Sequence, residues 1–134
     1  MSTVADYLKD AFRLPGIIGE NDPVSAEQGA DGIRVFNDMI GALRGDGIEL
    51  GIAPQSSTTA TLLVPEEDRL GVKYLLAVYL CQNYGREPSQ LVSQIADNNY
   101  KRMLRRAVIN DALENNAIMP LGEGNGRLFN INIG

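Results

Sequence analysis

The clearest candidate functional site in this chain is a cluster of basic side chains, which could bind a partner through electrostatic attraction. The cluster falls within six residues: Lys101, Arg102, Arg105 and Arg106. At helical spacing these cations lie roughly opposite the apolar residues, where they could contact phosphates without reading base sequence. The same pattern fits a solvated helix face, so both interpretations remain open. We expect few carboxylates close to the cluster, since Asp97 and Asp111 lie only at its ends. No aromatic residue interleaves with it, so stacking of single-stranded bases is not indicated.

Residues suited to covalent or acid–base catalysis are scarce. The chain has no histidine, which removes the commonest general base and the commonest metal ligand. Cys81, the only cysteine, lies in an apolar run and is expected to be a core residue. Glu66 and Glu67 are adjacent carboxylates that could suggest a hydrolase, but the start of a helix already explains them. We therefore expect no enzymatic activity, no cofactor and no metal.

The C-terminal segment shows the alternation of a half-buried strand. Glycines at 122, 124 and 126 precede a run in which apolar residues and asparagines alternate: Arg127, Leu128, Phe129, Asn130, Ile131, Asn132 and Ile133. No partner strand lies nearby in the sequence, and a lone strand cannot satisfy its own backbone groups. The pattern predicts a docking tail over residues 119–134, following a helical domain over residues 1–118. A strand on its own domain, or a frayed terminus, is the alternative.

Charge is divided unevenly along the chain. Residues 1–68 carry twelve acidic and four basic side chains, a balance of −8, whereas residues 69–134 carry five acidic and eight basic ones, a balance of +3. A polarised protein can present different faces to different neighbours. We find no apolar run long enough to span a membrane and no secretory pattern at the N-terminus, so no membrane partner is expected.

The elements that position these residues are mainly helical. Capping boxes at Thr3 and Ser25 predict the first two helices, which end near Pro15 and near Gly45. The segment 48–64 is β-like and predicts two short strands or one extended arm, lying on the domain or reaching a neighbour. A third helix, apolar nearly all round, follows residues 65–68 and should be central. Five of its side chains are expected to be mostly buried: Leu75, Leu76, Val78, Tyr79 and Leu80.

The last helix is predicted to begin after a cap at Ser89 and to run from Gln90 toward Asn115. The expected fold is therefore a bundle of about four helices with a β-like arm and an extended tail.

Four motifs occur in an order that resembles a known family. They are R-L-P-G-I-I-G (13–19), D-G-I-R-V-F-N-D-M-I-G-A-L-R-G-D-G-I (31–48), L-L-A-V-Y-L-C-Q-N-Y-G-R-E-P-S (75–89) and I-A-D-N-N-Y-K-R-M-L-R-R (95–106). This order is similar to that of the head-to-tail adaptors of short-tailed bacteriophages, also called packaged-DNA-stabilisation or tail accessory proteins. The similarity covers most of residues 1–110, and F-N-I-N-I-G (129–134) resembles the tail of some members.

The resemblance implies a structural protein of the virion, made in the host cytoplasm and located at the head–tail junction. Its implied partners are the portal protein, further copies of itself in a ring that is usually twelvefold, a downstream tail or nozzle protein, and packaged double-stranded DNA. Such a ring extends the DNA channel and retains the genome. The alternative function is a small DNA-binding or regulatory module that uses the basic cluster, against which the acidic first half weighs.

Overall fold

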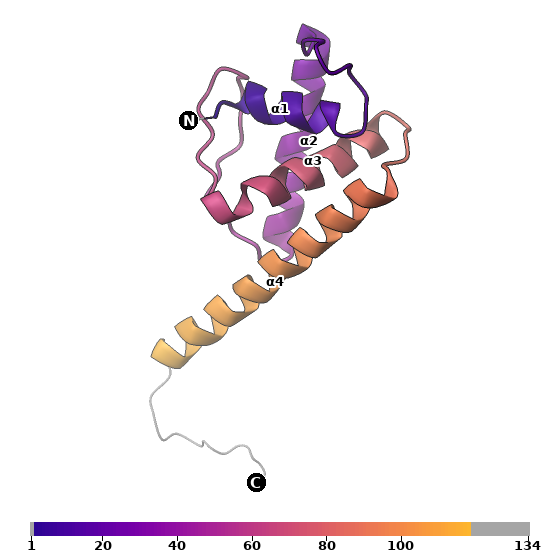
Figure 1. Cartoon of the computed structure of the whole chain (residues 1–134). Coiled ribbons are helices and arrows are strands. Elements are labelled where there is room, and N and C mark those ends of the chain that lie inside the picture. The colour runs from indigo at the N-terminus through magenta and orange to yellow at the C-terminus, as the bar shows by residue number, and fades with distance from the viewer. Residues whose placement is uncertain (1, 119–134) are drawn as a thin grey trace.

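Four α-helices make up most of the fold, as the sequence predicts (Figure 1). The computed structural model describes residues 2–118, and side chains from residue 2 to residue 113. The helices are α1 (Val4–Arg13), α2 (Ala26–Gly45), α3 (Arg69–Asn83) and α4 (Gln90–Ile118), with a 3-10 turn, η1 (Glu66–Asp68), leading into α3. Within residues 2–118, no helix is both long and apolar enough to cross a membrane.

The predicted capping boxes begin the first two helices. Thr3 Oγ1 accepts from the Asp6 amide at 3.3 Å, and the Asp6 carboxylate accepts from the Thr3 amide at 2.9 Å. Ser25 and Gln28 make the same reciprocal pair at 3.1 Å for both bonds. Each pair satisfies amides that have no partner inside the helix, which is typically worth about 1 kcal/mol. The Ser89 hydroxyl likewise accepts from the Val92 amide at 3.2 Å, as the sequence predicts.

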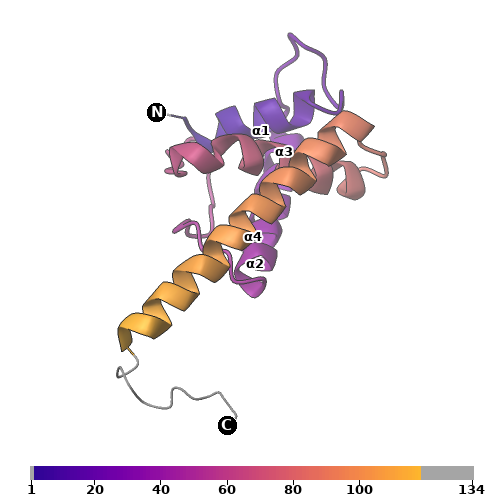
Figure 2. The same ribbon diagram turned by 60° about the horizontal axis from the view of Figure 1, so that its bottom comes forward.

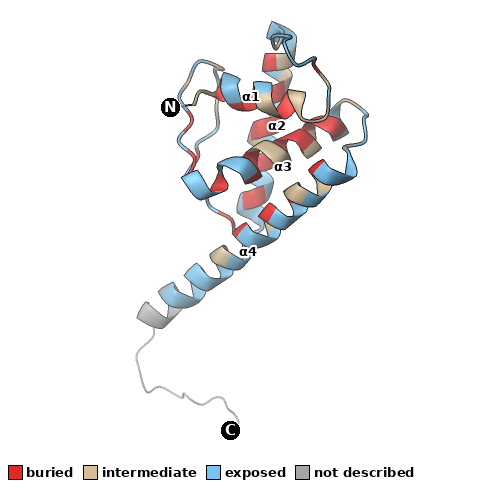
Figure 3. Cartoon of the chain, in the orientation of Figure 1, coloured by how far each residue is buried: buried red, intermediate tan, exposed pale blue. Residues whose placement is uncertain are grey.

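Helix α3 is the centre of the domain. It packs against α1, α2 and α4, which accounts for its nearly all-round apolar sequence. Leu76 and Leu80 are fully buried and Leu75 is 8% exposed, so the prediction is confirmed for these three. Val78 and Tyr79 also pack against the core and are mostly buried, as predicted, but keep some exposure because the packed helices leave one side of α3 incompletely covered (Figure 3).

The segment 48–64 is extended and lies on its own domain. It buries Ile48, Leu50, Ile52, Leu62 and Val64. It pairs with the N-terminus through one isolated antiparallel bridge, Thr3 to Thr61. The Val4 and Ala5 amides donate to the Ala60 and Thr58 carbonyls at 2.9 Å each, and the Leu62 amide donates to the Ser2 carbonyl at 3.0 Å. The pairing reaches into the first turn of α1, where the Val4 and Ala5 amides have no partner inside the helix, and the helical course of the chain from Val4 keeps a longer ladder from forming. Of the two predicted forms, the structure shows the extended arm, and residues 2–118 contain no strand longer than this bridge.

Helix α4 extends well past the other three helices (Figures 1 and 2). Its first half packs on α3 through residues such as Val92, Ala96 and Met103. Between residues 105 and 113, most of its side chains are exposed to solvent (Figure 3). The predicted docking tail over residues 119–134 follows this end of α4 and lies outside the described residues.

Candidate interaction surfaces

The basic cluster on α4 has more polar partners than the sequence predicts. Arg106 bonds to Asp68 at 2.6 Å, Lys101 pairs with Asp97 at 2.9 Å, and Arg102 donates to the Glu67 carbonyl at 2.8 Å. The expectation of few neighbouring carboxylates is therefore wrong. It failed because the packing of α4 on α3 brings η1, which is more than thirty residues earlier in the chain, beside the cluster.

Asp68 is the least expected member of this surface. The sequence assigns the acidic run before α3 to capping, but the Asp68 side chain makes no capping bond and is 1% exposed. Both of its carboxylate oxygens accept from Nη2 of Arg106. A buried carboxylate needs such a partner, since an unpaired charge in the interior is costly. No local pattern in the sequence indicates a pair whose members are 38 residues apart.

Glu66 and Glu67, the carboxylates that could suggest a hydrolase, are both exposed on η1. A carboxylate oxygen of Glu67 lies 3.9 Å from Nη1 of Arg106, so Glu67 is next to the ion pair between Asp68 and Arg106. The turn therefore contributes to holding α4 in place.

Arg105 differs from the other three cations. It is exposed, and no ion pair or side-chain hydrogen bond involves it within the described part of the chain. Lys101 is also largely exposed, with 62% of its side-chain surface accessible, and its partner is on the same helix. These two cations face solvent and can meet a partner, whereas Arg102 and Arg106 tie α4 to its own domain.

Two tyrosines fix α2 to the following helices. The Tyr84 hydroxyl donates to Asp31 at 3.1 Å, and the Tyr100 hydroxyl donates to Asp46 at 2.7 Å. Burial and this hydrogen bond to a carboxylate raise the pKa of Tyr84 to about 12. The hydrogen bond to Asp46 raises the pKa of Tyr100. Both contacts hold α2 and its C-terminal cap against the second half of the chain.

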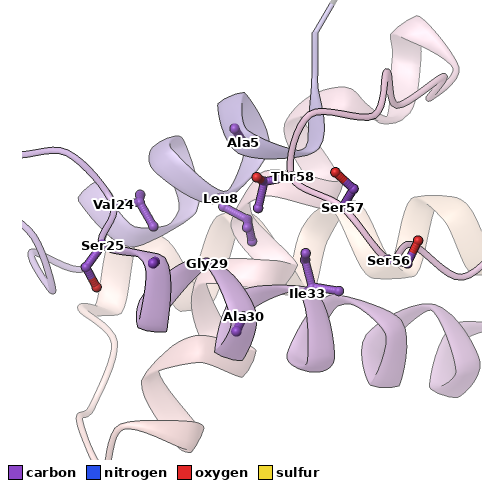
Figure 4. A pocket seen from close by; sticks show the side chains of 11 residues that line it. Ala5, Leu8, Val24, Ser25, Gly29, Ala30, Ile33, Ser56, Ser57 and Thr58 are labelled. Carbon is purple, nitrogen blue, oxygen red and sulfur yellow. The ribbon is translucent and has the colours of Figure 1, made fainter.

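A pocket of about 410 Å³ opens between the start of α1, the start of α2 and the loop at residues 56–58 (Figure 4). Most of the side chains that line it are small: Ala5, Ala26, Gly29, Ala30, Ser56 and Ser57. Leu8, Val24 and Ile33 are its larger apolar members. The two helices meet closely beside it, since a Cβ atom on Gly32 would lie 2.6 Å from Leu8 Cδ2. Its lining combines small apolar side chains with the hydroxyls of Ser25, Ser56, Ser57 and Thr58.

The segment predicted to bind a partner, Arg127 to Ile133, lies outside the described residues. Its assignment as a docking tail stays a prediction, and so does the assignment of the basic cluster to a DNA channel. The structure adds that the helix preceding the tail leaves the bundle before it ends (Figure 1).

Comparison with known proteins supports the resemblance seen in the sequence. The family described as the P22 tail accessory factor matches residues 11–132, which include all of α2, α3 and α4 and most of the predicted tail. No curated protein matches the chain. Because the family match spans most of the sequence, the chain belongs to the P22 tail accessory factor family, a family of structural components of the phage virion.

Proposed function

We propose that this protein is a head-to-tail adaptor, several copies of which form a ring below the portal, extend the DNA channel and connect it to the tail. The observation that carries the proposal is the family match, which runs without a break through the helical domain and into the tail. Retention of packaged DNA and binding of a downstream tail or nozzle protein complete the proposed role.

The shape of the domain supports this role. A central α3, packed by three helices, makes a rigid body, and α4 carries the chain past that body before the tail begins. A tail that starts away from its own core can reach another protein without disturbing the bundle. We propose that residues 127–133 dock by adding a strand to the portal or to a neighbouring adaptor, with Phe129, Ile131 and Ile133 filling pockets and setting the register.

We further propose that the basic cluster faces packaged DNA through its outward members. Arg105, exposed and without a partner in the described region, is the best placed to contact phosphates, and Lys101 is largely exposed beside it. Arg102 and Arg106 contribute positive potential while bonded to their own domain. The alternative of a free-standing DNA-binding module is weaker, because three of the four cations have a polar partner among the described residues.

A direct test is to mix the protein with its assembled portal and image the complex by cryo-electron microscopy. We expect rings of the adaptor bound below the portal, and we expect a chain truncated after residue 126 to bind much more weakly. A helical domain that folds normally and yet shows no binding to the portal, at concentrations that saturate other adaptors, would contradict the proposal.

A separate test addresses DNA. Arg105→Glu should lower genome retention in assembled particles while leaving ring formation intact, because no ion pair or side-chain hydrogen bond within the described domain involves this side chain. Asp38→Lys is a matched control, since it also reverses one exposed charge on a helix surface. If Arg105→Glu disrupts assembly and leaves retention unchanged, Arg105 belongs to a protein interface and does not face DNA.

A further inference from the structure

The apolar face of α4 changes sides along the helix. Residues seven apart lie along nearly the same side, and the row that faces α3 reads Ala96, Met103, Asn110. Its first two members are buried and apolar, whereas the third is polar and exposed. The row on the opposite side reads Gln94, Lys101, Val108, with the polarity reversed.

The second half of α4 therefore turns its apolar side away from its own domain. Val108, Ile109 and Leu113 are 61%, 58% and 62% exposed, and Ala112 lies among them; we call these four residues the distal face. An isolated helical extension is marginally stable in water, and grouped exposed apolar residues usually mark a contact surface. The distal face is thus suited to a body other than its own bundle.

A recess walled by small apolar side chains and by serine and threonine hydroxyls lies at the other end of the molecule. The pocket between α1, α2 and residues 56–58 is at the α1 end, whereas α4 finishes at the opposite end (Figures 1 and 4). Its volume of about 410 Å³ falls in the range of clefts that hold small ligands, ~300–1,000 Å³. Large side chains from a helix would fit among its alanine, glycine and serine walls.

We infer that the distal face of one copy docks into this pocket of a second copy, and this inference rests on the proposed ring. Two different patches on one molecule are what a head-to-tail interface requires, and repetition of such an interface closes a ring when the rotation allows. Charge also favours a second copy: the half of the chain that forms the pocket carries a balance of −8, and exposed Arg105 lies one turn before the distal face.

Two variants block the two surfaces separately. Ala30→Arg fills the pocket from an exposed position on α2, and Ile109→Gln with Leu113→Gln makes the distal face polar. Ala42→Arg is the control for the first, since it is exposed on the same helix away from the pocket. Leu91→Gln is the control for the second: Leu91 is 64% exposed and lies eighteen residues, or five turns, before Ile109 on the same side of α4.

The experiment uses the full chain without portal, labelled with ¹⁵N, and follows amide shifts as its concentration rises to the millimolar range. Wild type and both controls should show shifts at the pocket and at the distal face together. Either blocked variant alone should associate about tenfold more weakly, the effect expected for a central apolar contact. A mixture of the two blocked variants should restore shifts at the pocket of one and the distal face of the other, because that pair retains one intact interface.

Shifts confined to the distal face would overturn the inference, since they would mean that two α4 helices pack on each other. The inference would also be overturned if the mixture failed to restore association, or if the amide shifts of the wild type did not change with protein concentration. Because portal is absent, a failure here leaves the portal-binding test untouched, and a failure of portal binding leaves this result intact.

Discussion

Replacing Arg106 with methionine should destabilise the domain, because the change leaves the buried carboxylate of Asp68 without its cation. Both oxygens of Asp68 accept from Arg106 at 2.6 Å, and Asp68 is 1% exposed. Removing one partner of a fully buried pair costs roughly 3–5 kcal/mol. The Arg106 side chain is 38% exposed, so water reaches part of the pair. We therefore expect a loss of about 2 kcal/mol, between the values for buried and surface pairs.

Removing the carboxylate in place of the cation should lower the free energy of unfolding by less. Asp68→Asn leaves a guanidinium that is already partly hydrated, and the amide keeps an oxygen that can accept, so we expect a loss of about 1 kcal/mol. The double variant should be more stable than the sum of the two losses predicts, by about 1 kcal/mol, because both single changes remove the same interaction. Urea unfolding followed by far-ultraviolet circular dichroism measures the free energy of unfolding of all four proteins: the wild type, the two single variants and the double variant.

Arg105→Met provides the matched control, since it removes the same side chain one position away on the same helix. Because Arg105 has no partner in the described region, its replacement should change the free energy of unfolding by less than about 0.5 kcal/mol. Equal losses for Arg105→Met and Arg106→Met would refute the reasoning. A loss below about 0.5 kcal/mol for Arg106→Met would show that the pair is effectively solvated.

Three further outcomes are expected. Leu76→Ala should cost roughly 2–5 kcal/mol in urea unfolding because Leu76 is fully buried, whereas Leu70→Ala, at a residue 54% exposed, should cost less than about 0.5 kcal/mol. Deletion of residues 127–134 should leave the melting temperature nearly unchanged but weaken binding to the portal; unfolding of the truncated chain would assign the tail to its own core. The pKa of Tyr84, raised from 10.0 to about 12, means that the folded state keeps a proton that the unfolded state loses in this range. Stability should therefore fall as pH rises from 10 to 12, and less steeply in Tyr84→Phe; equal slopes would show that neither burial nor the bond to Asp31 raises the pKa of Tyr84 in the folded state.

The sequence by itself predicts the features that depend on neighbouring residues. Thr3 with Asp6, and Ser25 with Gln28, begin their helices through bonds that span three residues. The sequence of helix α3 indicates a central position, because apolar residues occur on nearly every side of the helix. The order of motifs also led to the family, which the match over residues 11–132 confirms.

Tertiary structure alone decided how distant segments meet. The sequence shows Arg105 and Arg106 as equivalent neighbours, yet a step of about 100° around the helix sends one to solvent and the other to Asp68. Likewise, the alternation within residues 48–64 indicates an extended segment but does not specify its partner, which proved to be residues 2–5, at the start of α1. Local patterns report backbone preferences and the period of burial, whereas pairing across tens of residues depends on which faces the packed helices leave adjacent.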